Sequence, residues 1–230
     1  MNRILVVAAH PDDEVLGCGG MIAAARDKKR DVRVIFLAEG VMSRYSADQI
    51  NSPAALEASR LRNANAFKAL DILGVPADQV FVSERPCCRL DQASLLALTQ
   101  EIEAHLKDFR ASVVYTHAQN DPNIDHQIAF KAVLPAVRPL GPQSPKAVYS
   151  FEVLSSTEWN PAHPFQANCF VDISSSIDRK ISALAAYGDE MRPAPHPRSE
   201  DMVRSLARFR GAQSGLNYAE SFNLIRAIES

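Results

Sequence analysis

A histidine and two carboxylates lie close together near the beginning of the chain, at His10, Asp12 and Asp13. An imidazole and a carboxylate at this spacing can turn toward the same divalent ion. The other carboxylate can then stay off the metal and act as a general base. Taken alone, the string is also typical of a turn in which an aspartate caps the next helix. The apolar run at residues 4–9 and the Gly-x-Gly-Gly segment at residues 17–20 favour the metal site, because they indicate a buried strand that ends at the string.

A second group of polar residues, at positions 116–126, follows another predicted strand. Within it His126 could supply a further metal ligand, and Asp125 could orient a neighbouring group. An isolated histidine is more often a capping or core residue. The pairing with the first group favours ligation by His126, whereas a structural or orienting role is favoured for His117.

The stretch AHPDDEVLGCGG at residues 9–20 resembles the signature of the LmbE-like, or PIG-L, N-acetylglucosaminyl deacetylases, and residues 121–126 resemble the second motif of that family. The resemblance implies a Rossmann-like fold and a zinc-dependent amidase that removes acetyl groups from amino sugars. It implies that Asp12 is the general base. It also implies one zinc ion per chain, with other divalent ions left open, bound by His10, Asp13 and His126.

The resemblance continues over nearly the full chain, with departures that concern the substrate. Asn123 stands where many relatives have histidine, and its amide can donate to an oxyanion but cannot shuttle protons. The string at residues 195–199 and the ending at residues 210–222 are similar to the family, whereas residues 85–88 depart from it. Trp159 could stack on a pyranose or plug the surface. The candidate substrate-binding residues are Arg89, Asp91, Trp159, His196 and Arg198.

Strands and helices are predicted to alternate along the chain, which favours an α/β fold with a mostly parallel sheet flanked by helices. The active site is then expected at the C-terminal ends of the strands. The predicted strands are residues 4–9, 32–38, 79–82, 112–115, 146–154 and 168–173. The predicted helices are residues 15–29, 53–73, 92–110, 126–138 and 176–191. Arg60 and Arg62 are expected on a solvated helix face, with a contact to a hydroxyl or phosphate of the substrate as the alternative.

Composition narrows the class of protein further. At 230 residues the chain is predicted to be a single deacetylase-like domain, residues 1–230. The net charge of −2, with acids and bases interspersed, argues against a nucleic-acid or polybasic membrane surface. The apolar run at the N-terminus is too short for a signal peptide or a spanning helix, so we expect a cytoplasmic enzyme with no transmembrane segment. The cysteines show no Cys-x-x-Cys pair and are expected to be reduced, and a homo-oligomer is left open.

The function expected from these observations is removal of the acetyl group from an N-acetylated amino sugar, in a glycoconjugate or a nucleotide sugar. A dinucleotide site is disfavoured, because Asp12 and Asp13 would repel a pyrophosphate. A non-haem iron oxygenase is disfavoured by the α/β pattern, and a glycosidase by the adjacency of the two carboxylates. The alternatives that stay open are a metal-containing sugar-binding module without catalysis and an amidase for a non-sugar acyl amide.

Overall fold

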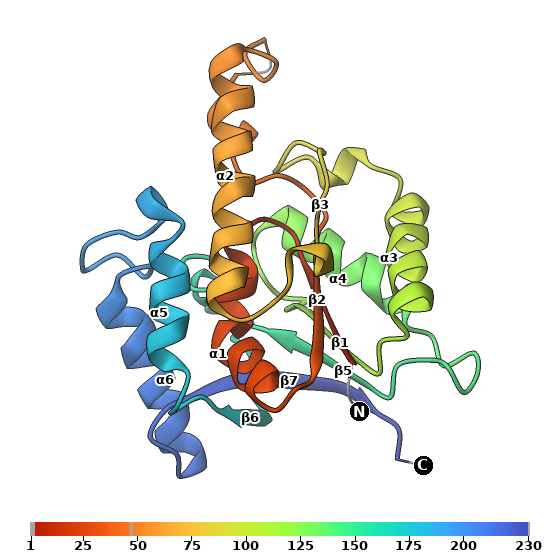
Figure 1. Ribbon diagram of the computed structural model, residues 1–230, viewed down its shortest axis with the longest axis vertical. Helices are drawn as coiled ribbons and strands as arrows, with labels where there is room; N and C mark the ends of the chain where they lie inside the picture. Colours follow the sequence, from red (N-terminus) through yellow and green to blue (C-terminus); the bar gives the residue numbers. More distant parts are fainter. Residues whose placement is uncertain (1–2, 47, 230) are drawn as a thin grey trace.

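The computed structural model describes residues 3–46 and 48–229, which form a twisted sheet between two layers of helices (Figure 1). The strands are β1 Arg3–Ala8, β2 Asp31–Phe36, β3 Val80–Val82, β4 Val113–His117, β5 Ala147–Phe151, β6 Cys169–Asp172 and β7 Ala219–Ala227. The helices are α1 Asp13–Asp27, α2 Pro53–Ile72, α3 Leu95–Phe109, α4 Ile124–Ala136, α5 Ile177–Ala185 and α6 Glu200–Ser214. Among the described residues, no helix is both long enough and apolar enough to cross a membrane.

The described strands form one sheet in the order β3-β2-β1-β4-β5-β7-β6. The pairs from β3 to β5 are parallel, and β7 pairs antiparallel with β5 and with β6. The prediction of an α/β fold with a mostly parallel sheet is therefore confirmed. The strand order reverses its direction of growth between β1 and β4, and ligand sites of such sheets lie beyond the strand ends at that point.

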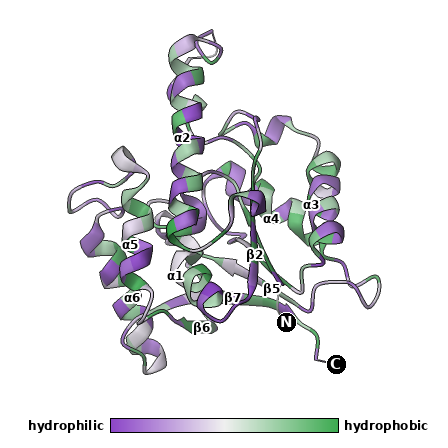
Figure 2. Cartoon of the chain, viewed as in Figure 1, coloured by the Kyte–Doolittle hydropathy of each residue, from purple (hydrophilic) through white to green (hydrophobic). Residues whose placement is uncertain are grey.

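Strand β1 is the centre of the core because both of its faces are buried. Leu5 and Val7 pack with apolar residues of α3 and α4 on one face. Ile4 and Val6 pack with α1, α2 and α5 on the other face. A parallel strand covered by helices on both sides must be apolar throughout, and this explains the uninterrupted run at residues 4–9. The covering helices α2, α3 and α6 carry hydrophilic and hydrophobic residues in turn (Figure 2).

Several boundaries differ from those predicted, for identifiable reasons. Helix α4 begins at Ile124 rather than at His126, because the side chain of Asn123 accepts a hydrogen bond of 2.9 Å from the backbone N–H of Asp125 and caps the helix. Helix α5 ends at Ala185, short of the predicted residue 191, and Gly188 beyond it has a positive φ of 59°. Helix α6 and strand β7 were not predicted as elements.

Candidate active site

Three potential metal ligands meet where β1 and β4 end. His10 follows β1, Asp13 is the first residue of α1, and His126 lies in the first turn of α4. Their ligand atoms all lie within 4.8 Å of one another, and all three residues are buried. His10 Nδ1 and His126 Nε2 are each 3.3 Å from Oδ2 of Asp13. Two atoms at zinc-ligand distances of about 2.0–2.2 Å on a tetrahedral ion are about 3.3–3.6 Å apart, so each histidine has the spacing from Asp13 that two ligands of one ion would have.

A carboxylate holds each of the two histidines from behind. Oδ2 of Asp125 is 2.8 Å from His10 Nε2. Oδ1 of Asp121 is 3.1 Å from His126 Nδ1. Asp121 also accepts hydrogen bonds from the hydroxyls of Ser156 and Thr157, which fix its own orientation. Such carboxylate–histidine pairs select the ring nitrogen that faces a metal.

These carboxylates and Asp13 prepare the cluster for a cation. Burial disfavours the charged form of His10, but Asp125 and Asp13 outweigh it and raise the pKa of His10 to about 10. Burial likewise opposes protonation of His126, but Asp13 and Asp121 raise its pKa to about 9. For Asp13, burial is outweighed by the neighbouring histidines, His126 above all, and its pKa falls well below the usual value. The cluster therefore holds positive charge readily, and a metal ion would replace protons there.

His117 is close to the cluster but is not arranged to bind the metal. Its Nε2 accepts a hydrogen bond of 2.8 Å from the backbone N–H of Ala9, which uses the lone pair that a metal would need. Its ring stacks on that of His126 at 3.9 Å between centroids. Burial, with the charge of His126, lowers the pKa of His117 to about 3, so the ring is neutral. His117 therefore lies against the ring of His126, a position that suits either of the roles expected for it, structural or orienting.

Asp12 is held beside the cluster by two arginines. Its Oδ2 accepts hydrogen bonds from Arg62 Nη2 at 2.7 Å and from Arg198 Nη1 at 2.6 Å. Arg62 also donates to the carbonyl of Pro11 and contacts Glu190. Asp12 has a backbone φ of +120°, which residues other than glycine rarely adopt. Such strained residues concentrate at functional sites. The expectation that Arg62 lies on a solvated face is wrong, because its side chain is 6% exposed, whereas Arg60 is exposed as expected.

The remaining predicted residues lie in the surrounding loops. Asn123 directs its Oδ1 to the cap of α4. Arg89 and Asp91 flank Leu90, whose N–H donates to Asp125, so this loop is fastened beneath His10. Asp91 itself is exposed.

The predicted substrate residues Arg198 and Trp159 differ in how closely they approach Asp12, and His196 helps to place the first of them. His196 Nδ1 accepts the backbone N–H of Arg198 and shapes the turn that presents this arginine to Asp12. Trp159 ends the short turn that begins at Thr157, whose hydroxyl binds Asp121. Trp159 is 61% exposed. The structure therefore brings Arg198 to Asp12 and leaves Trp159 largely in solvent.

Sequence reasoning gave Asp121 no role, and it did not foresee the contact of Arg62 with Asp12. Asp121 carries a weak local signal, because its Oδ1 also accepts the N–H of Asn123 in a turn that leads into α4. Arg62 carries none, because its partner Asp12 is 50 residues away in the chain.

Comparisons with known proteins relate the chain to de-N-acetylases. Residues 5–137 match the family model described as PIG-L, GlcNAc-PI de-N-acetylase. The chain is 28% identical over 249 residues to a 1D-myo-inositol 2-acetamido-2-deoxy-alpha-D-glucopyranoside deacetylase of Mycobacterium sp. (strain JLS), covering 89% of this chain and 79% of that protein. It is 24% identical over 248 residues to a diacetylchitobiose deacetylase of Thermococcus kodakarensis, covering 99% of this chain and 85% of that protein. A solved N,N'-diacetylchitobiose deacetylase from Pyrococcus horikoshii shares the fold with a TM-score of 0.77 at 20% identity, over 97% of this chain and 84% of that one.

Proposed function

Because this chain belongs to the PIG-L family of de-N-acetylases, we propose that it is a metal-dependent hydrolase that removes the acetyl group from an N-acetylated amino sugar. The products are acetate and a free amine. The observation that carries the proposal is the cluster of His10, Asp13 and His126 with Asp12 held beside it. A binding module would not require a second carboxylate fixed next to the ligands.

The donor set favours zinc, with one ion per chain. Two imidazole nitrogens and one carboxylate oxygen are typical of catalytic zinc sites that keep a position open. Zinc bound there would polarise the amide carbonyl and acidify a water molecule. Metal analysis of the purified protein should find about one zinc per chain and its loss in His10→Ala and His126→Ala. Full retention of the ion in both variants would contradict the assignment.

Asp12 is the proposed general base. Both arginines contact its Oδ2, and Oδ1 has no protein hydrogen-bond partner within the described residues. The free oxygen can take a proton from water and return it to the departing amine. Asn123 is the proposed oxyanion donor, because its Oδ1 is used by the helix cap and its Nδ2 is left to donate.

Asp125 and Arg198 act on other residues of this site. Both oxygens of Asp125 are engaged by His10 and by backbone N–H groups, which suits an orienting role rather than that of a base. Arg198 positions Asp12 from the loop that His196 shapes. The sugar itself is assigned to Arg89, Asp91 and Trp159.

The substrate class follows from the relatives, whose names describe deacetylases of N-acetylated sugars. A mass-spectrometric screen for the loss of one acetyl group tests it. The screen compares free, nucleotide-linked and lipid-linked N-acetylglucosamine with an acetyl-lysine peptide, using Asp12→Asn as the inactive control. Turnover of the peptide alone would overturn the sugar assignment, and turnover of none would favour the binding module.

A further inference from the structure

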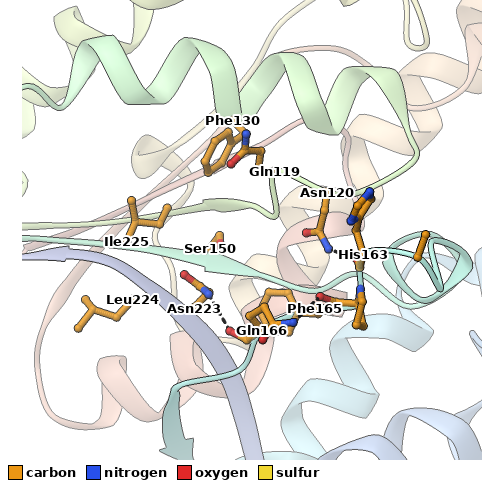
Figure 3. A pocket seen from close by; sticks show the side chains of 12 residues that line it. Gln119, Asn120, Phe130, Ser150, His163, Phe165, Gln166, Asn223, Leu224 and Ile225 are labelled. Atoms are coloured by element: carbon orange, nitrogen blue, oxygen red, sulfur yellow. Dashed lines mark hydrogen bonds between the residues drawn. The ribbon is translucent and has the colours of Figure 1, made fainter.

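A cavity of about 560 Å³ lies on the side of the sheet that carries α4, outside the metal-ligand cluster (Figure 3). Ser150 of β5 and Asn223 of β7 form its floor, Phe130 of α4 one wall, and residues 162–166 another. Helix α4 packs over β4 and β1, so the antiparallel extension by β7 leaves the neighbouring sheet surface uncovered there. The size is within the range of about 300–1,000 Å³ that is usual for small-molecule sites.

The lining is rich in amides, and its described residues include no permanently charged side chain. None of the lining residues that the structure describes is lysine, arginine, aspartate or glutamate. A phosphate or carboxylate ligand would therefore find no lysine or arginine to pair with, and His163 is the one described lining side chain that could carry positive charge. The polar side chains of the lining are those of Gln119, Asn120, Ser150, His163, Gln166 and Asn223.

Several of these polar groups lack a partner in the protein. Within residues 3–46 and 48–229, no protein hydrogen bond reaches the Ser150 hydroxyl or the Gln119 amide. Asn223 donates 2.7 Å from Nδ2 to the carbonyl of Gln166, so its Oδ1 is left to accept. Ser150 is only 4% exposed, and its hydroxyl, which lines the cavity, is left to bond with water or with a ligand there.

Apolar side chains complete the walls. Phe130 and Phe165 present aromatic rings, and Leu224 and Ile225 present aliphatic surface from β7. Paired donors and acceptors beside apolar surface match a sugar ring, whose hydroxyls lie at the rim and whose C–H groups lie on the faces. We propose that this cavity is a second binding site, for an uncharged saccharide unit, which does not require the metal.

The cavity and the metal cluster share a wall. Asn120 lines the cavity, and its side-chain amide donates to the carbonyl of His163. Its backbone carbonyl accepts a hydrogen bond of 2.8 Å from Asn160 Nδ2. The next residue is Asp121, which orients His126. A saccharide in the cavity would thus contact the loop that supports one metal ligand, without contacting the ligands themselves.

Side-chain amide signals provide a direct test by ¹⁵N-resolved nuclear magnetic resonance. N-acetylglucosamine should shift the NH₂ signals of Gln119, Gln166 and Asn223 in the wild-type protein and equally in His10→Ala. Gln119→Leu and Asn223→Leu should each raise the dissociation constant about tenfold, the effect expected for one lost hydrogen bond. Gln119 is exposed, so its replacement carries little risk to folding. Gln100→Leu, exposed on α3 and outside the lining, is the matched control and should leave the dissociation constant unchanged.

Three outcomes would overturn the proposal. The first is the absence of shifts in these signals. The second is their loss in His10→Ala, which would place binding at the metal cluster. The third is a stronger response to triglycine or to glucosamine 6-phosphate, which would assign the cavity to a peptide or an anionic ligand. None of them bears on acetate release, which is measured separately.

Discussion

Nε2 of His10 lies 2.8 Å from Oδ2 of Asp125, and this contact decides which side of the imidazole faces the metal cluster. With Nε2 engaged, Nδ1 is directed toward Asp13 at 3.3 Å. Asp125 also accepts the N–H groups of Cys88 and Leu90, so one carboxylate fixes both the ligand and the loop beneath it.

Asp125→Asn should therefore weaken zinc binding while His10 and the other ligands stay in place. An asparagine cannot accept all of these hydrogen bonds, and the loss of a carboxylate behind a ligating histidine typically costs about 10–100-fold in metal affinity. Competition with a chromogenic chelator measures the change. Asp71→Asn, at an exposed position on α2, is the control and should bind zinc as the wild type does. Wild-type affinity in Asp125→Asn would show that His10 does not depend on this contact.

Asp12→Asn should retain zinc and lose turnover by about a hundredfold or more, because the amide cannot accept a proton as a carboxylate does. Acetate release and metal content measured on the same preparation check both parts. Near-normal turnover in a zinc-loaded variant would assign the base to another residue. Asp48→Asn, at an exposed position unlike that of Asp12, is the control and should behave as the wild type.

Arg62→Lys should lower kcat more than it changes KM. The guanidinium contacts the Pro11 carbonyl, Asp12 and Glu190 with different nitrogens, and an ammonium cannot reach all three. The loss of hydrogen bonds to a charged partner corresponds to a decrease of about 10–100-fold. Arg60→Lys, on the same helix but exposed, is the matched control. A change confined to KM would indicate that Arg62 binds substrate instead of positioning Asp12.

The parts of the site that follow directly from strand ends could be predicted from the sequence. The apolar run before His10 and the strand before His126 place both groups at the same edge of a parallel sheet. Local pattern therefore sufficed for the fold class, and together with the resemblance to the deacetylase family it predicted that His10, Asp13 and His126 meet, as they do in the structure.

The contacts that depend on tertiary structure could not be predicted in this way. The sequence around Arg62 is typical of a solvent-exposed helix. Only the packing of α2 in the folded protein buries this side chain against Asp12. Strand β7 pairs with β5 and β6 from the end of the chain, and nothing in its own residues specifies those neighbours. Helix α4 begins early because one asparagine side chain turns back to cap it, which periodicity does not detect.

Gly17→Ala should destabilise the protein although alanine is the better helix former. A Cβ at this position would lie 2.3 Å from Cδ2 of Phe151, within the core. Overpacking costs about 1–3 kcal/mol, which outweighs the gain of about 1 kcal/mol in helix propensity. Thermal denaturation followed by circular dichroism measures the change. Gly141→Ala, with open space around its Cβ, should show no loss of stability.

The buried ion pair of Lys180 and Glu220 joins the two halves of α1 around its irregular residue Cys18. Lys180 donates to the carbonyl of Leu16 before the break, and Glu220 accepts the N–H groups of Gly20 and Met21 after it. Lys180→Met leaves a buried carboxylate without its cation, which should cost about 3–5 kcal/mol. For a chain of this size that corresponds to a fall in Tm of roughly 6–20 °C.

The double variant Lys180→Met with Glu220→Gln should recover part of the loss, because no uncompensated charge remains. Lys131→Met, exposed on α4, is the control for removal of a lysine. A double variant less stable than Lys180→Met would show that the backbone cap by Glu220, rather than the ion pair, holds the break in α1.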